Sequence, residues 1–579
     1  KHFNWLKENG YNVISWQQVI DAENGQGTLP DNAVLLSFDD GYETMYNVVF
    51  PLLKAYNYPA VFAPVTGWLD TPADQKIAYA DKMLDRSVFA TWSQVKEMEQ
   101  SGLVEVASHT HNLHNGINAN PSGGQLPAVI APEYKNGKYE TEDAYKNRLK
   151  SDFTRSVQTL VNHVGKKPRV MVWPYGQFND VAVQLARQAG MPHYFSLGEK
   201  IINKVGDKHI GRLLLNAETD LNTVKNYLDG IDESKQIQRV LHVDLDYVYD
   251  ADKAQQAKNL DKLIDRIYRY GVTTVYLQAF SDPDGDGVAD ALYFPNKYLP
   301  VRDDIFGRIA WQLQTRAGVK VYAWMPVLAF DLRKSVKEAE YVIDSRTGKP
   351  STKAYLRLSP YNKQNVEIIK SIYNDLSFYA KFNGILFHDD AFLTDFEGAE
   401  GNHAEGMVSP QAKQKTQDLI LLTHQLTDAL KPYFLRGSYS LKTARNLYAS
   451  VITNPNAEEW LAQNLKTLTD NYDTTAIMAM PYMENEHPIS QEEAYQWFAS
   501  LIENVKSQAP LDKVLFEFQA MNWRTQKPIP ESELIDWMKL LQKNHIYSYG
   551  YYPDNFLTNQ PDLNKMKPYF SVNTNAGKQ

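Results

Sequence analysis

The first half of the chain alternates short apolar runs of β type with amphipathic helical stretches. The expected strands are 33–38, 60–65, 103–109 and 169–176, and the clearest helices are 46–56 and 180–190, the latter stopped by Gly190. Strands that alternate with helices are typical of α/β folds. The pattern therefore predicts an N-terminal α/β domain, a deformed (β/α) barrel, over residues 1–232.

The second half repeats the same alternation more regularly. Eight strand-type runs are separated by helical stretches such as 256–270, 410–430 and 491–506. Eight β–α units over this length predict a C-terminal (β/α)8 TIM-like barrel over residues 233–579. The eight runs are 239–249, 273–280, 320–330, 384–390, 436–446, 474–482, 514–523 and 548–556.

Length, charge and cysteine usage narrow the class of protein. A chain of 579 residues is too long for one core, and the net charge of -9 argues against a nucleic-acid partner while permitting a cationic ligand. The absence of Cys excludes disulfides and thiolate chemistry. No apolar run is long enough to span a membrane. The chain opens inside an amphipathic helix, so we expect an N-terminal strand to be missing and draw nothing about location from the lack of a signal peptide.

Two adjacent carboxylates, Asp39 and Asp40, end the first predicted strand in "LLSFDDGYET". A histidine-rich stretch, "SHTHNLHNG" (108–116), follows another strand, and His with carboxylate suits Zn²⁺ or a similar divalent ion. One aspartate would bind the metal, and the other would act as a base on a water whose pKa the metal lowers. We expect Arg169 to form an ion pair with the free aspartate and to orient it. "WPYG" (173–176) predicts an aromatic wall, so Tyr42, Trp173 and Tyr175 are candidate substrate contacts.

"SFDDGY", the histidine-rich loop and "R…WPYG", in this order, resemble the first three motifs of the polysaccharide deacetylases, carbohydrate esterase family 4. The resemblance implies that Asp39 is the general base, that Asp40 binds the metal with two histidines, and that Arg169 fixes the base. The family spaces its histidines four apart, which would place the second at Leu113. We assign His109 and His114, with one residue inserted between them; His111 with His114 is the alternative. The implied cofactor is a divalent ion: Zn, Co, Ni or Fe.

The family's general acid, a histidine from a late "LxH" motif, has no clear counterpart in this chain. His193 is a candidate. In the poly-N-acetylglucosamine deacetylases, whose first domain is circularly permuted, that histidine lies on an N-terminal strand. The alternative is therefore an acid that precedes the first residue of this sequence.

The strand ends of the second predicted barrel carry carboxylates and aromatic rings, as the active sites of TIM barrels do. Aromatic faces stack on sugars, while carboxylates bind amines or cleave glycosidic bonds. "DPDGDG" (282–287) resembles a calcium loop, but Tyr293 replaces the final Glu, which favours a carboxylate-rich turn. The candidate substrate-binding residues are Asp244, Asp246, Trp324, Tyr482, Trp523 and Tyr552, and the candidate acid/base residues are Asp389, Asp390 and Glu517.

Both domains together resemble the exopolysaccharide deacetylases of poly-β-1,6-N-acetyl-D-glucosamine export systems (PgaB type), through "HVDLDYVYD", "QAFSDPDGDG", "ILFHDDA" and "YGYYPDNF". The resemblance implies partial de-N-acetylation of that polymer during export and biofilm formation. It implies a second domain that binds the product and in some members cleaves it. It also implies a periplasmic protein, held at the outer membrane by a lipidated N-terminus outside this chain, and a porin-type exporter as partner. We expect a monomer. The alternatives are a deacetylase of chitin or peptidoglycan, a non-enzymatic glycan-binding export module, and a glycoside hydrolase with an accessory first domain.

Overall fold

The computed structural model describes residues 1–198, 202–231, 237–398, 407–437 and 440–574. The chain divides into two compact units. The N-terminal unit takes Lys1–Ser234 together with Leu435–Ser440, and the barrel unit takes Lys235–Phe434 and Leu441–Gln579. Among the described residues, no helix has the length and apolar character needed to cross a bilayer.

Parallel strands form the centre of the N-terminal unit. Strands β3 (Ser37–Asp40), β4 (Ala60–Pro64) and β7 (Val104–Val106) make one sheet, and β12 (Val170–Val172), β13 (His193–Leu197) and β14 (His209–Arg212) make another. A parallel bridge between Ser108 and Met171 joins the two sheets. The apolar run 33–38 is divided between β2 (Ala33–Leu35), which pairs with β1 (Asn12–Ile14), and β3. The result is a deformed α/β barrel whose strands end at one common edge.

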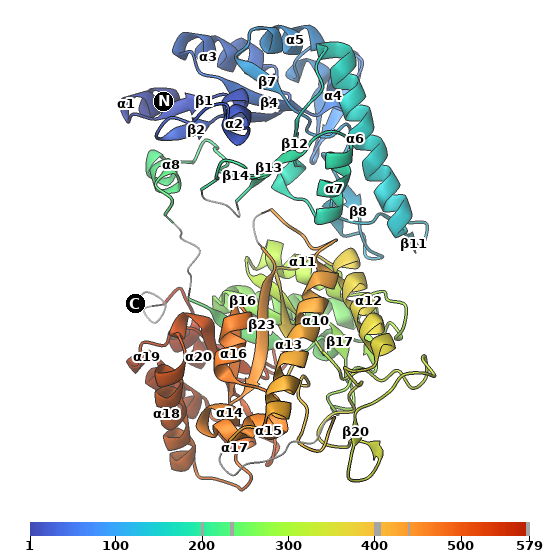
Figure 1. The fold of residues 1–579 in the computed structure, drawn as a ribbon, viewed down its shortest axis with the longest axis vertical. Helices are drawn as coiled ribbons and strands as arrows, with labels where there is room; N and C mark the ends of the chain where they lie inside the picture. The colour runs from blue at the N-terminus through green and yellow to red at the C-terminus, as the bar shows by residue number, and fades with distance from the viewer. Residues whose placement is uncertain (199–201, 232–236, 399–406, 438–439, 575–579) are drawn as a thin grey trace. The chain divides into compact units, whose positions relative to one another are not determined.

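Helices cover these strands, and side-chain caps define where several of them begin. Ser15, Thr91, Thr141 and Asn179 each accept a hydrogen bond from a backbone N–H in the first turn of the helix that follows. Helix α5 packs beside α6 and over β7 (Figure 1). The helices are α2 (Trp16–Glu23), α3 (Phe50–Tyr56), α5 (Trp92–Gln100), α6 (Glu142–Val164) and α7 (Asp180–Gln188).

The second unit is a closed eight-stranded parallel barrel in chain order, which confirms the predicted TIM-like fold. Its strands are β15 (Arg239–Val243), β16 (Thr274–Gln278), β19 (Lys320–Met325), β22 (Gly384–Phe387), β23 (Lys442–Tyr448), β24 (Thr474–Ala479), β25 (Val514–Gln519) and β28 (Tyr549–Tyr552). Its longer helices are α10 (Lys253–Tyr270), α11 (Phe306–Arg316), α12 (Lys363–Tyr379), α13 (Pro410–Leu430), α18 (Gln491–Gln508), α19 (Glu531–Lys543) and α20 (Leu563–Phe570).

The fifth barrel strand begins later than the predicted 436–446. Arg436 belongs to the N-terminal unit, where its backbone exchanges two hydrogen bonds with Phe178 and its guanidinium contacts Asp180 at 3.1 Å. Backbone groups engaged in this bridge are not available to the barrel. Strand β23 itself runs from Lys442 to Tyr448.

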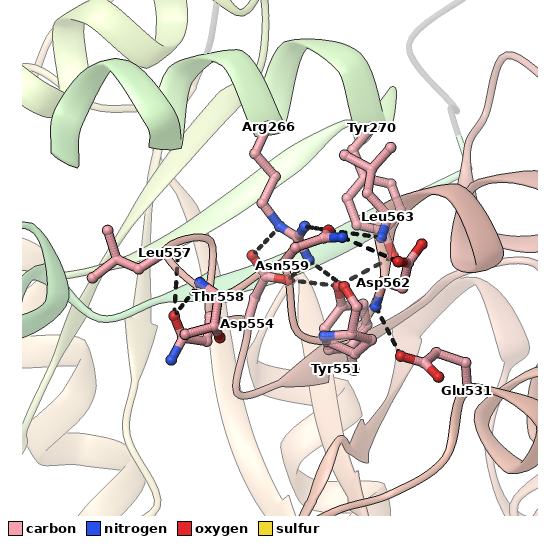
Figure 2. A network of polar contacts seen from close by, with 12 residues as sticks. Arg266, Tyr270, Glu531, Tyr551, Asp554, Leu557, Thr558, Asn559, Asp562 and Leu563 are labelled. Carbon is pink, nitrogen blue, oxygen red and sulfur yellow. Dashed lines mark hydrogen bonds and ion pairs between the residues drawn. The ribbon is translucent and has the colours of Figure 1, made fainter. Parts of the chain in front are cut away.

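A buried polar network fastens the last strand of the barrel to helix α10 (Figure 2). Arg266 donates to both oxygens of Asp554, at 2.7 and 2.9 Å, and also to the Asn559 side chain and the Pro561 carbonyl. The Tyr551 hydroxyl donates to the same carboxylate at 2.7 Å. Asp554 follows a strand end, but its oxygens are engaged in holding the fold rather than facing a substrate.

Candidate active sites

The first site lies where β3, the loop after β7 and the turn after β12 meet. Asp40, Thr110 and Tyr175 have φ angles of 75°, 69° and 58°. Non-glycine residues rarely adopt this left-handed conformation, which costs of the order of 1–3 kcal/mol each and tends to occur at functional sites. Three such residues in one place indicate that the backbone is held in an unfavourable conformation in order to orient the side chains of this site.

Asp40, His109 and His114 come together as the sequence predicts. The Nε2 atoms of His109 and His114 each lie 3.2 Å from Oδ1 of Asp40, and the three ligand atoms all lie within 4.8 Å of one another. Burial would raise the pKa of Asp40, but the two histidines lower it far below its usual range. The spacing of five between the histidines therefore gives a compact ligand set.

The histidine loop is held by groups that do not face this set. Nδ1 of His109 lies 2.7 Å from the Val172 carbonyl, so it carries the proton and leaves Nε2 free to accept or to bind a metal. His111 turns away and meets the Thr66 hydroxyl at 2.9 Å. The carboxylate of Asp152 accepts the backbone N–H groups of His111 and Asn112, and burial raises its pKa to about 6.

Asp39 is paired with Arg212, not with Arg169. Arg212 donates from two nitrogens to the two oxygens of Asp39, at 2.8 and 2.9 Å, and also to the Ser37 hydroxyl. Burial would raise the pKa of Asp39, but the Arg212 charge brings it below its usual range. The assignment of Arg169 was wrong: it precedes β12, at the opposite edge, and forms an ion pair with Glu105 at 2.9 Å.

The three rings predicted for the aromatic wall have different surroundings in the structure. Tyr175 is 41% exposed, and its ring lies 4.5 Å from that of His114, so it fits a substrate contact. Tyr42 stacks on Phe89 at 5.3 Å beside the site, and its substrate role stays a prediction. The Trp173 prediction was wrong, because that ring is 0% exposed and packs in the core.

His193 does not reach the first site. It is the first residue of β13, whereas the site residues follow the carboxyl ends of the strands, and its Nε2 lies 2.7 Å from Glu23. Its role as general acid is therefore excluded. Burial and the nearby cations lower its pKa, although Glu23 opposes them.

The second site surrounds Asp389 at the carboxyl ends of the barrel strands. Its carboxylate accepts hydrogen bonds from Tyr355 (2.9 and 3.0 Å) and Tyr448 (3.0 Å), and His388 Nε2 lies 2.9 Å from it. Trp324 donates to Nδ1 of His388 at 2.8 Å, so the proton of His388 sits on Nε2 and points at Asp389. Burial would raise the pKa of Asp389, but His388 and the two tyrosines bring it below its usual range.

Glu484 is a second carboxylate near Asp389, and its pKa is shifted in the opposite direction, upward. It follows β24 in the short helix α17 (Pro481–Glu484) and accepts the Ala449 backbone N–H at 2.8 Å. Burial raises its pKa to about 7, and the charge of Asp389 contributes to this rise. Two neighbouring carboxyl groups whose pKa values are pushed apart are a typical acid/base pair.

Two of the predicted acid/base residues have structural roles instead. Asp390 is fully buried and accepts the backbone N–H groups of Val327, Leu328 and Ala329, so it shapes a loop. Glu517 is 1% exposed inside the barrel, where it meets His242 Nε2 at 2.7 Å and Asn446 at 3.0 Å. Burial and pairing leave neither carboxylate available to a substrate, so these two assignments were wrong.

Asp244, Tyr552 and Trp523 form one side of the barrel mouth. Burial and the Asp246 charge raise the pKa of Asp244 to about 7, and the Tyr552 hydroxyl bonds to it. Trp523 stacks on Tyr552 at 6.0 Å. These three remain candidate sugar contacts, and Trp324, 4% exposed, is the floor that supports His388.

Asp246 and Tyr482 are engaged elsewhere. Asp246 accepts from Ser281, Arg302, Gln278 and the Asp282 backbone, which ties the "DPDGDG" turn to the barrel. The Tyr482 hydroxyl donates to Glu533 on α19. These bonds occupy polar atoms that a sugar could use, and the predicted sugar contacts of both residues stay predictions.

Gly287 of the "DPDGDG" turn packs against Tyr355, a residue of the second site. Asp282 accepts the backbone N–H groups of Asp286 and Gly287, which shapes the turn. A Cβ on Gly287 would lie 1.9 Å from Cε1 of Tyr355. The turn therefore allows Tyr355 to reach Asp389.

Comparisons with known proteins give a family for each unit. A family model described as Polysaccharide deacetylase matches residues 26–194, and one described as Hypothetical glycosyl hydrolase family 13 matches residues 242–552. The poly-β-1,6-N-acetyl-D-glucosamine N-deacetylase of Escherichia coli K12 is 41% identical over 99% of this chain and 88% of its own length. The chain belongs to this N-deacetylase family.

Solved structures from two bacteria match its separate parts. The PgaB (BpsB) glycoside hydrolase domain from Bordetella bronchiseptica is 39% identical, with a TM-score of 0.52, over 58% of this chain and 99% of that one. A de-N-acetylase from Aggregatibacter actinomycetemcomitans is 68% identical, with a TM-score of 0.39, over 39% of this chain and 86% of that one. The predicted enzyme class, a polysaccharide N-deacetylase, is confirmed.

The donor set of this N-deacetylase fits a divalent ion. Polysaccharide deacetylases are generally metal-dependent. One carboxylate oxygen and two imidazole nitrogens match the ligands of catalytic zinc sites, which keep a further position open. The Val172 carbonyl fixes the His109 tautomer as second partners of metal ligands usually do.

Several residues that the structure brings into the two candidate sites were not among the predicted site residues. Arg212 ends β14 (His209–Arg212), a short strand with little apolar character. The apolar pattern therefore did not predict this strand, and nothing marked Arg212 as lying at a strand end. Tyr355 and Tyr448 carry no motif of their own. Glu484 lies just past a predicted strand, among the carboxylates of the barrel rim, but it was not chosen as an acid/base residue, because only its burial in the folded chain marks it out.

Proposed function

We propose that this chain removes the acetyl groups from some of the sugar units of poly-β-1,6-N-acetyl-D-glucosamine in a metal-dependent reaction. The observation that carries the proposal is the arrangement of Asp40, His109 and His114 beside the Asp39–Arg212 pair. The identity with relatives that bear this activity in their names supports the choice of polymer.

The side chains divide the work of amide hydrolysis. A bound divalent ion would supply a Lewis acid and lower the pKa of a water molecule. Asp39, kept ionised by Arg212, accepts the proton of the attacking water. Arg212 holds both oxygens of that base in one orientation, and Tyr175 offers an exposed ring to the sugar. Among the described residues we assign no group that protonates the leaving amine.

The test is acetate release from β-1,6-linked N-acetylglucosamine oligomers by protein that carries its complete natural N-terminus. Zn²⁺, Co²⁺ or Ni²⁺ should restore activity after chelation, and Asp39→Asn should abolish it. β-1,4 oligomers separate the proposal from a deacetylase of chitin or peptidoglycan. If no acetate is released from either the β-1,6 or the β-1,4 oligomers, a non-enzymatic binding module would be favoured.

We propose a second activity for the barrel, cleavage of the partly deacetylated polymer. The specific observation is the placing of two carboxylates by neighbouring residues at the end of β23: Tyr448 donates to Asp389, and the Ala449 N–H donates to Glu484. The pKa of Asp389 is lowered, and that of Glu484 is raised to about 7. In this scheme Glu484 donates a proton to the glycosidic oxygen, and Asp389 acts as nucleophile or base. Asp244 and the Trp523–Tyr552 pair offer a carboxyl group and rings to an aminosugar.

Cleavage is tested by following product lengths on partly deacetylated polymer with Asp389→Asn and Glu484→Gln. Both variants should lose cleavage and keep acetate release, whereas Asp39→Asn should do the reverse. If the natural chain binds the polymer but leaves its length unchanged, the role of the barrel would be limited to holding the product.

We further propose that the protein acts in export of this polymer for the biofilm matrix. The family resemblance supports a periplasmic location, attachment to the outer membrane through a lipidated N-terminus, and a porin-type exporter as partner. Fractionation of cells that make the full-length protein tests the location. Recovery in the cytoplasm alone would overturn it.

A further inference from the structure

The two oxygens of Asp40 have different partners. Oδ1 faces the Nε2 atoms of His109 and His114, each at 3.2 Å. Oδ2 accepts a hydrogen bond from the Tyr79 hydroxyl at 2.9 Å. One oxygen therefore belongs to the metal-ligand set, and the other is bonded by a side chain 39 positions along the chain.

A dedicated hairpin brings Tyr79 to this place. Strands β5 (Lys76–Tyr79) and β6 (Lys82–Asp85) pair antiparallel, and Ile77 anchors the hairpin with 3% exposure. The Tyr79 ring lies 5.4 Å from Trp68 and stacks against His114 at 5.8 Å. The ring thus packs on one metal ligand while its hydroxyl bonds another.

We propose that Tyr79 is a positioning residue of the metal centre, whose hydroxyl fixes Asp40 so that only Oδ1 is presented to the ion. A carboxylate can bind a metal with one oxygen or with both. A hydrogen bond to Oδ2 removes the second mode and sets the direction of Oδ1. This inference rests on the proposed metal-dependent function.

Tyr79→Phe removes the hydroxyl and keeps the ring, so it isolates the hydrogen bond. Tyr46→Phe is the matched control, because the Tyr46 hydroxyl also donates to a carboxylate, Glu97, at 2.8 Å on the surface of the same unit. Asp40→Ala removes the ligand itself. The measurement is Co²⁺ titration of the metal-free full chain, read from its visible absorption and from calorimetry.

We expect Tyr79→Phe to weaken Co²⁺ binding about 10- to 100-fold, as loss of a partner of a metal ligand does. Its Co²⁺ spectrum should shift toward a higher coordination number as Asp40 becomes free to bind through both oxygens. Tyr46→Phe should match the natural chain in both respects. Near-ultraviolet circular dichroism should show that both variants are folded.

Two failures can be told apart. Unchanged affinity and spectrum in Tyr79→Phe, with binding lost in Asp40→Ala, would overturn the role of Tyr79 alone. Unchanged binding in Asp40→Ala would overturn the metal site on which the inference rests. A lower melting temperature in Tyr79→Phe with unchanged Co²⁺ affinity and spectrum would limit the hydrogen bond from Tyr79 to Asp40 to stabilising the fold.

Discussion

Arg212 and Asp39, 173 positions apart, form a two-pronged ion pair at 2.8 and 2.9 Å beside the metal-ligand set. The planar guanidinium matches both carboxylate oxygens, so it fixes the orientation of the base as well as its charge. The orientation of the proposed base therefore depends on both hydrogen bonds from Arg212.

We expect Arg212→Lys to lower kcat for acetate release about 100-fold, because a single ammonium cannot hold both oxygens and a misplaced base loses that much. Arg169→Lys is the control, since Arg169 pairs with Glu105 away from the site. Steady-state kinetics on both variants decide the matter. A larger loss in Arg169→Lys would restore the original assignment.

Cleavage by the barrel should depend on pH through Glu484. Its pKa is raised to about 7, and a general acid must be protonated to act. The rate should therefore fall as pH rises through about 7, while Asp389, with its lowered pKa, stays ionised over the same range. A profile of kcat/KM against pH on partly deacetylated polymer measures this. A rate that stays level to pH 9 would contradict the role of Glu484.

Gly287→Ala should impair cleavage at least 10-fold, because its Cβ would lie 1.9 Å from the Tyr355 ring and displace a donor from Asp389. Gly285→Ala is a matched control. Gly285 also has a positive φ, 73°, but a Cβ there meets nothing within 4 Å. Acetate release should be unaffected in both. Equal losses of cleavage in the two variants would mean that backbone strain alone is responsible.

Arg266→Ala should destabilise the barrel by about 3–5 kcal/mol, because it leaves the buried Asp554 carboxylate without its partner. Arg269→Ala, on the same helix, is the control: its pair with Asp265 is exposed and should contribute about 0–1 kcal/mol. Urea unfolding followed by circular dichroism gives both values. Similar small losses would show that the network in Figure 2 is not a main anchor of the last strand.

The sequence alone determined the order of the elements, and its resemblance to the polysaccharide deacetylases supplied the candidate metal ligands. Strand and helix patterns are local, since each depends on apolar spacing within a few residues, and eight of them in succession allow few folds besides a barrel. Asp40 is the last residue of β3, His109 and His114 lie in the loop after β7, and parallel strands end at one edge of the sheet. The meeting of Asp40 with the histidine loop was therefore predictable once the strands were found, whereas the choice of His109 over His111 came from the resemblance.

Only the tertiary structure decided which charged groups pair. Arg169 and Arg212 are both next to strands, but Arg169 precedes β12 whereas Arg212 ends β14, at the edge where Asp39 lies. Asp389 and Asp390 are adjacent in sequence, yet one faces two tyrosines and the other three backbone N–H groups. The direction of a side chain, its burial and its partners depend on contacts between distant segments, and no local pattern records them.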